Sequence, residues 1–241
     1  MNTSSSFAEC FTANTEHYIE AWDIVTKEEG KKAVKKTSWQ HLKVPPIQDH
    51  ARGIKKIGPA PFVDKKHVLY GAIDIDVYPT NHKQVIAELN QNKINKFIMV
   101  RSTSGGAHLF FRFKEPALAG VVQTTLAEIA KIIGYEGSEV FPKQVDFNPV
   151  FDQKKNDGKG GWGGVGNAIY LPYGTDNSCV IDHKGNELTI EQFEKYWPSQ
   201  IIDDINSLPK PKQNRKITTS HVQNIAVEPT RPSESYREAL Q

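Results

Sequence analysis

The stretch His67–Val77, HVLYGAIDIDV, decides the fold that we expect for this chain. Apolar residues alternate with acidic ones around Asp74 and Asp76, which is the periodicity of a β-strand. Residues at i and i+2 of a strand point to the same face, so both carboxylates lie on one face, about 7 Å apart along the chain. The apolar residues between them occupy the other face, which favours a central strand over a solvated edge strand.

The flanking sequence extends this strand into an α+β pattern. We expect strands at 96–100, 108–113, 138–147 and 167–174, and helices at 81–92, 117–134 and 188–197. Asn81 and Thr189 are suitable N-caps, and Gly134 is a suitable helix stop. The order of elements predicts an α+β fold of the split βαβ kind, a mixed or antiparallel sheet with helices on one face.

The composition sets further bounds. The chain has 241 residues and a net charge of +2, so binding to nucleic acid by overall charge alone is excluded. No apolar run approaches the ~20 residues of a membrane helix, and the start lacks a signal peptide, so we expect a cytoplasmic protein with no membrane association. Two cysteines do not make a Cys-rich zinc site, and we expect no zinc.

The distribution of Pro, Gly and polar residues along the chain predicts three regions. We expect a helical N-terminal extension at 1–37, where EHYIEAWDIV (16–25) is typical of a helix, a folded core at 38–208 and a flexible, Pro-rich linker or tail at 209–241. A Gly- and Lys-rich loop is expected at 152–166.

Asp74 and Asp76 are the first candidates for chemistry. Two adjacent carboxylates repel each other unless a cation lies between them, and hard oxygen ligands suit Mg²⁺ or Mn²⁺. A solvated strand face is the alternative interpretation of the same residues.

The turn RSTSGGAH, Arg101–His108, is the second candidate. Ser102, Thr103 and Ser104 offer hydroxyls, and Gly105 and Gly106 let backbone N–H groups approach an anion closely. The alternative is a Gly-rich hairpin with a structural histidine.

Further polar residues lie on the next short strands. Glu139, Lys143 and Asp146 belong to the fourth strand, and Asn167 opens the fifth. Glu139 alone is more typical of an exposed position, and the alternative for Asn167 is a strand that leads to a Pro-Tyr turn. Together with the first strand and the turn they supply three carboxylates and several phosphate donors on one sheet face, which are the parts of two-metal phosphoryl transfer.

These motifs, in this order, resemble the archaeo-eukaryotic primase superfamily of primase-polymerases, in particular the primases of TOTE-type conflict systems and of phages and plasmids. The resemblance rests on four motifs across about residues 38–197. They are His50 with Gly53 and Gly58, the strand of Asp74 and Asp76 with the turn Ser102–His108, EVFPKQ (Glu139–Gln144), and GNAIYLPY (Gly166–Tyr173). It implies an RRM-like catalytic core with flanking helices and an N-terminal α/β module.

The resemblance also implies a function: a DNA primase-polymerase that transfers nucleotides from dNTPs or NTPs onto a 3′-hydroxyl along a single-stranded DNA template, in replication of a phage, plasmid or mobile element. Asp74, Asp76 and Glu139 would hold two Mg²⁺ or Mn²⁺ ions. His108, Ser102, Ser104, Gly105 and Gly106 would bind the triphosphate, with charge from Arg101 and Lys143, while Asn167 would position the nucleotide or template. Many members carry Asp as the third ligand, which leaves Asp146 as the alternative to Glu139.

Other functions remain open. A metal-dependent nuclease could use the same acids, and a non-catalytic RRM-like nucleic-acid binder would display aromatic residues such as Phe110, Phe111 and Phe113 on its sheet. The sequence leaves open whether a C-terminal domain or a helicase partner is needed.

Overall fold

The computed structural model describes residues 6–11, 13, 17–25, 34–41, 45–146, 168–175 and 177–209. The chain divides into two units, residues 1–211 and residues 212–241, of which the first is compact. All described residues belong to the first unit. The loop predicted at 152–166, Asn167, and the tail predicted beyond Pro209 lie outside the described residues.

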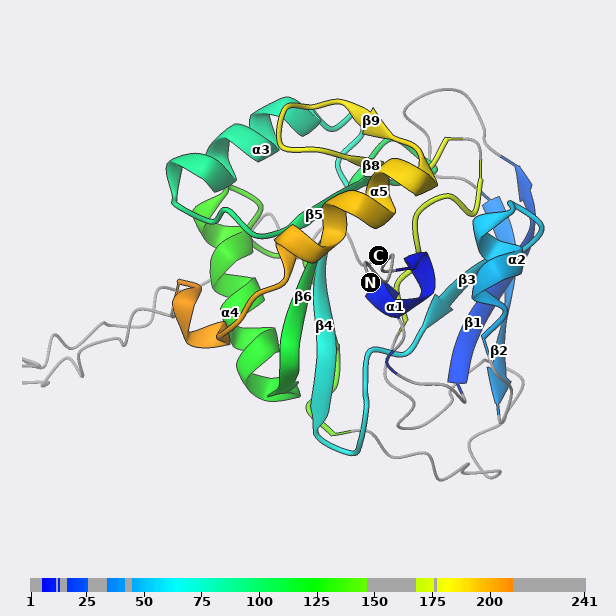
Figure 1. Ribbon diagram of the computed structural model, residues 1–241, viewed down its shortest axis with the longest axis horizontal. Helices are drawn as coiled ribbons and strands as arrows, with labels where there is room; N and C mark the ends of the chain where they lie inside the picture. Colours follow the sequence, from blue (N-terminus) through cyan, green and yellow to red (C-terminus); the bar gives the residue numbers. More distant parts are fainter. Residues whose placement is uncertain are drawn as a thin grey trace, which may run out of the picture. The chain divides into compact units, whose positions relative to one another are not determined.

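A six-stranded sheet occupies the centre of the first unit (Figure 1). Its order is β7-β4-β6-β5-β8-β9, and every pair of neighbours is antiparallel. The strands are β4 (His67–Ile75), β5 (Ile98–Arg101), β6 (Ala107–Leu118), β7 (Glu139–Phe141), β8 (Cys179–Ile181) and β9 (Glu187–Leu188). Because β4 lies between β7 and β6, its predicted central place is confirmed, and so is the α+β fold class.

A second sheet of three antiparallel strands, in the order β2-β1-β3, precedes the large sheet in the chain. It contains β1 (His17–Val25), β2 (Val34–His41) and β3 (Lys56–Pro59). Along the chain, the short helix α1 (Phe7–Phe11) precedes β1, and the short helix α2 (Ile47–Ala51) lies between β2 and β3. The helix predicted over 16–25 is wrong, because these residues form β1. Strand partners on both edges of β1 satisfy its backbone hydrogen bonds, and this pairing overrides the local helical tendency.

Helices pack on both faces of the large sheet. Helices α3 (His82–Gln91) and α4 (Ala119–Ile132) share a core with the face of β4 that carries Ile73. Helices α1 and α5 (Ile190–Tyr196) share a second core with the face that carries Ala72. The expectation of helices on one face is therefore wrong. Its physical cause is visible in β6, where Leu109, Phe111 and Phe113 are buried on one face and Phe110 is buried on the other.

The predicted helix ends are confirmed. The Asn81 side chain accepts a hydrogen bond from the Gln84 N–H at 3.1 Å at the start of α3. Thr189 and Gln192 form a reciprocal capping box at the start of α5. Gly134 follows α4 with φ +83°, a conformation that favours glycine. Two 3₁₀-helices, η2 (Trp197–Gln200) and η3 (Ile205–Ser207), follow α5.

Two predicted strands differ from the structure. The strand predicted over 138–147 is limited to the three residues of β7, and the strand predicted over 167–174 is absent from the described residues 168–174. There, Leu171 N–H donates to the Ile57 carbonyl at 3.1 Å, and a turn at Pro172 and Tyr173 (φ +71°) ends the extended stretch. This segment, residues 168–174, is therefore not a strand of the large sheet, and it is held by hydrogen bonds to Ile57 of β3, to Ser178 and, from the Tyr173 hydroxyl, to Leu188 of β9.

Candidate functional site

Acidic side chains lie side by side at one end of the large sheet. Asp74 of β4 is directly opposite His108 of β6 and directly opposite Glu139 of β7. Residues directly opposite each other in a sheet share a face. Asp76, two residues after Asp74, lines the same cleft as Asp74 and His108. The strand register thus brings the residues of three separate sequence motifs together, with Asp74 in the middle.

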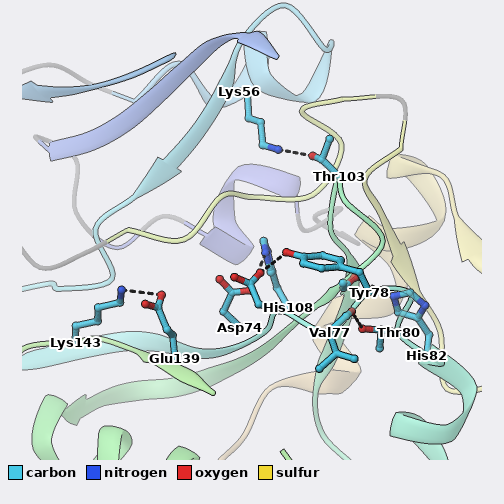
Figure 2. A network of polar contacts seen from close by, with 12 residues as sticks. Lys56, Asp74, Val77, Tyr78, Thr80, His82, Thr103, His108, Glu139 and Lys143 are labelled. Atoms are coloured by element: carbon cyan, nitrogen blue, oxygen red, sulfur yellow. Dashed lines mark hydrogen bonds and ion pairs between the residues drawn. The ribbon is translucent and has the colours of Figure 1, made fainter. Parts of the chain in front are cut away.

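The two aspartates each contact a nearby donor. His108 Nε2 lies 3.4 Å from Asp74 Oδ1, and the side chains are only 13% and 20% exposed (Figure 2). The Tyr78 hydroxyl donates a hydrogen bond to Asp76 Oδ1. Burial, with a contribution from this bond, raises the pKa of Tyr78 above its usual range. Tyr78 therefore stays protonated and serves as a neutral donor to the Asp76 carboxylate.

Glu139 contacts a lysine. Lys143 Nζ lies 2.7 Å from Glu139 Oε2, and the Glu139 side chain is 59% exposed. Across the described ranges, no three His, Cys, Asp or Glu side chains are grouped closely enough to hold a metal ion as they stand. The donor set nevertheless suits a hard divalent cation, because it offers carboxylate oxygens from adjacent strand positions. To share an ion with Asp74, the Glu139 carboxylate has to turn away from Lys143.

The turn between β5 and β6 borders the acids. Ser102 N–H donates to the Gly106 carbonyl, and Gly105 N–H donates to the Ser102 carbonyl, both at 2.9 Å. Gly105 has φ +85°, which a tight turn of this kind requires. Since the Gly105 N–H donates within the turn, the turn contributes hydroxyl-bearing residues to the cleft lining, namely Ser102, Thr103 and Ser104.

Gly106 permits a close approach of three elements. A Cβ atom at this position would lie 2.6 Å from the Ile75 carbonyl oxygen, 3.0 Å from the Tyr78 ring and 3.2 Å from Ser102 Oγ. The absence of a side chain therefore lets the turn sit directly against the end of β4, which keeps the turn beside the aspartates.

The far wall of the cleft comes from β3 and from residues 168–171. Lys56 of β3 is only 6% exposed, its ammonium donates to Thr103 Oγ1, and it lies 5.1 Å from the centre of the Tyr170 ring (Figure 2). Lys56 thus places a positive charge against the turn that carries the serines.

Lys56, Tyr78 and Tyr170 were not among the residues that the sequence singled out. The signal for Lys56 was its place two residues before Gly58, a glycine of the first motif. The signal for Tyr78 was its place two residues after Asp76. Neither residue type is distinctive without knowledge of which strands pair.

Arg101 points to a different contact. Its guanidinium binds Glu187 of β9 at 2.6 Å and the Asn177 carbonyl at 3.1 Å. Asp146 is exposed, at the end of the segment after β7, and Asn167 lies outside the described residues. The structure therefore groups Asp74, Asp76, His108 and the turn in one cleft. Arg101, at the end of β5, forms an ion pair with Glu187 instead.

Comparison with known proteins places the chain in a family. Residues 6–195 match the family model of the archaeo-eukaryotic primase domain of the TOTE conflict system. The chain belongs to this family. Among solved structures, this primase domain is similar to the archaeo-eukaryotic primase domain of the primase-polymerase of cyanophage S-2L. The two share 13% sequence identity and a TM-score of 0.36, over 76% of this chain and 90% of that one. No curated protein matches the chain.

In the part of the chain that the structure covers, no helix is long and apolar enough to cross a membrane. Family membership implies nucleotide and nucleic-acid substrates for domains of this kind, and the nucleotidyltransferase superfamily as the enzyme class.

Proposed function

We propose that this domain is a DNA primase-polymerase, which transfers nucleotides from dNTPs or NTPs onto a 3′-hydroxyl under the direction of a single-stranded DNA template. One observation carries the proposal. Asp74, flanked in register by His108 and Glu139, shares a cleft with the hydroxyls of the 102–104 turn. Carboxylates that can hold divalent ions, beside donors that can hold phosphates, are the parts that phosphoryl transfer requires.

The acids have the first role. Asp74, Asp76 and Glu139 are the residues that would hold two Mg²⁺ or Mn²⁺ ions. Bound ions supply Lewis acidity, which lowers the pKa of the attacking 3′-hydroxyl and neutralises the leaving pyrophosphate. Tyr78 orients the Asp76 carboxylate through its hydrogen bond, and His108 orients that of Asp74.

The turn and the far wall of the cleft together bind the nucleotide. Ser102 and Ser104, with His108 beside the acids, donate to the triphosphate, and Lys56 brings a buried positive charge from the far wall. Lys143 adds charge once Glu139 turns toward Asp74. Arg101 adds positive charge near the nucleotide while it stays paired with Glu187. Asn167 positions the nucleotide or the template.

The biological setting that we propose is the one that the family resemblance implies. Primers are made in the cytoplasm of a bacterial host, in the replication of a phage, plasmid or other mobile element.

The burial of the aromatic residues of β6 favours this function over a non-catalytic RRM-like binder. Phe110, Phe111 and Phe113 are 1%, 0% and 2% exposed, whereas such binders stack bases on exposed sheet aromatics. The serine-rich turn favours it over a nuclease, which needs no triphosphate site.

The decisive experiment is a primer-synthesis assay on single-stranded DNA with labelled NTPs or dNTPs and Mn²⁺. Wild type is compared with Asp74→Asn and with His67→Gln, a change at an exposed histidine that contacts Asp64 outside the cleft. We expect new product from wild type and His67→Gln, and none from Asp74→Asn. Degradation of the template would favour a nuclease, and DNA binding without incorporation would favour the binder. Equal incorporation by Asp74→Asn would overturn the assignment of the acids.

A further inference from the structure

His50 lies outside the catalytic acids, yet it joins two walls of the cleft. It belongs to α2 and is fully buried. Its Nδ1 atom accepts a hydrogen bond from the Ile57 N–H at 3.0 Å, and its Nε2 atom lies 2.6 Å from the Pro172 carbonyl oxygen. A backbone N–H can only donate and a backbone carbonyl can only accept. The ring is therefore neutral, with its proton on Nε2.

The two backbone groups belong to the parts that shape the cleft. Ile57 follows Lys56 on β3, and Pro172 follows the 168–171 wall that includes Tyr170. One imidazole ring thus spans the distance between the strand that carries the buried lysine and the segment that carries the tyrosine. Lys56 and Tyr170 already face each other at 5.1 Å.

Close glycine contacts tighten the same junction. A Cβ atom on Gly58 would lie 2.4 Å from the Ile169 carbonyl oxygen, and a Cβ atom on Gly174 would lie 2.4 Å from Cε1 of the His50 ring. Residues 168–171 belong to no helix or strand, so contacts of this kind determine where the wall stands. The spacing of His50, Gly58 and the segment 168–174 in the sequence therefore reflects one packed junction.

We propose that His50 is a positioning residue for the nucleotide-binding side of the cleft: its two ring hydrogen bonds hold β3 and residues 168–172 at the spacing at which Lys56 and Tyr170 can contact a nucleotide together. The inference rests on the proposed function for its ligand, a nucleoside triphosphate. The link between His50 and residues 168–172 is independent of the proposed function.

The charged surroundings are consistent with a neutral ring. The pKa of His50 is lowered to about 4, chiefly by burial; the positive charge of Lys56 acts in the same direction, and the backbone hydrogen bonds of the ring act against it. On α2 itself, the acidic neighbour is Asp49. His50 therefore keeps both hydrogen bonds throughout the neutral pH range.

Two amide substitutions separate the two hydrogen bonds. The side chain of Asn reaches the place of Nδ1, so His50→Asn keeps an acceptor for Ile57 and loses the donor to Pro172. The side chain of Gln reaches the place of Nε2, so His50→Gln keeps a donor for Pro172 and loses the acceptor for Ile57. His67→Gln is the control.

The first readout needs no substrate. It is amide hydrogen exchange at Leu171 and Tyr173, whose N–H groups donate to the carbonyls of Ile57 and Ser178. We expect exchange at both amides to rise about tenfold in His50→Asn and in His50→Gln, because each breaks one end of the bridge, and to stay near the wild-type rate in His67→Gln. Acceleration in only one of the two His50 variants, or in neither, would overturn the inference.

The second readout is the affinity for an α,β-imido dNTP with Mn²⁺, which binds without transfer, together with the split between KM and kcat. We expect the Kd and the KM of His50→Asn to rise about tenfold with kcat within about twofold. A fall in kcat at unchanged KM would contradict a positioning role. If the wild type does not bind the analogue, the proposed function fails while the exchange comparison still judges His50.

Gly174→Ala disturbs the junction from the other side and serves if His50→Asn does not fold. Its methyl group has to displace the His50 ring, so it should accelerate exchange at Leu171 as His50→Asn does. Wild-type exchange at Leu171 in Gly174→Ala would count against the link.

Discussion

Asp74 and His108 face each other across the β4–β6 strand pair, with Oδ1 and Nε2 3.4 Å apart. Their separation is set by the register of two long antiparallel strands, so this half of the site is built on the most rigid part of the fold. The other half depends on a turn and on residues 168–171, which no strand pairing fixes. The two halves should therefore respond differently to substitution.

Substitutions of Asp74 and His108 should separate the loss of a proposed metal ligand from the loss of a residue that orients this ligand. We expect Asp74→Asn to abolish incorporation, because it removes the carboxylate at the centre of the donor set. We expect His108→Asn to lower kcat/KM by about 10- to 100-fold, which is typical for a residue that orients a ligand carboxylate. Steady-state incorporation assays with Mn²⁺ measure both. Wild-type activity in His108→Asn would show that the pair has no role in the reaction.

Gly106 and Gly105 provide a matched pair in one turn. Gly106→Ala drives a methyl group against the Ile75 carbonyl, so we expect a loss of about 1–3 kcal/mol in stability and weaker nucleotide binding. Gly105→Ala has open space around its Cβ and incurs only the strain of φ +85°, about 1 kcal/mol. Denaturant unfolding and nucleotide titration check the order. A larger effect of Gly105→Ala on binding would contradict the close approach at Gly106.

The alternation in His67–Val77 was sufficient to predict the central strand and the shared face of Asp74 and Asp76, because side-chain direction in a strand is a local property. The caps Asn81 and Thr189 were predictable for the same reason. The β-strand at 17–25 was not, since its identity depends on partners far along the chain.

The nucleotide side of the cleft was harder to predict than the acids. Lys56 becomes a candidate only when β3 and the 102–106 turn meet, and the sequence does not show that contact. Arg101 was a reasonable candidate by position, yet Glu187, far along the chain, holds its guanidinium. The partner of a long charged side chain is a tertiary property.

Lys143 forms an ion pair with Glu139, the carboxylate that we propose as a metal ligand. The ion pair is partly exposed, so its contribution is modest, and we expect Lys143→Met to tighten Mn²⁺ binding about two- to fivefold. Mn²⁺ titration followed by electron paramagnetic resonance, in the absence of nucleotide, measures this directly. Lys143→Arg, which keeps the charge, is the control. Weaker Mn²⁺ binding in Lys143→Met would show that Lys143 supports the ion rather than competing with it.

Substitutions of Lys56 and of its neighbour Lys55 compare the effect of a buried charge on nucleotide affinity with that of a surface charge. Lys56→Met keeps the alkyl chain and removes the charge next to Thr103, so we expect nucleotide affinity to fall about tenfold. Lys55 pairs with Glu20 at 2.9 Å on the surface of the small sheet, and Lys55→Met should leave nucleotide affinity unchanged. Equilibrium titration with a dNTP analogue decides. Equal affinities for the two variants would exclude Lys56 from the nucleotide site.

The buried His50 predicts a specific pH dependence of stability. Its pKa is about 4 in the folded chain, against an ordinary value of 6.5. Between these values the unfolded chain binds more protons, so the contribution of His50 is complete above pH 6.5, is lost as the pH falls, and levels off below about pH 4. The full loss is on the order of 3 kcal/mol. Urea unfolding from pH 7 to pH 4 should therefore show a steeper decline in the free energy of unfolding for wild type than for His50→Gln, which does not titrate. Since carboxylates titrate in both proteins, the difference between the two curves isolates the histidine, and parallel curves would contradict a neutral, doubly hydrogen-bonded ring.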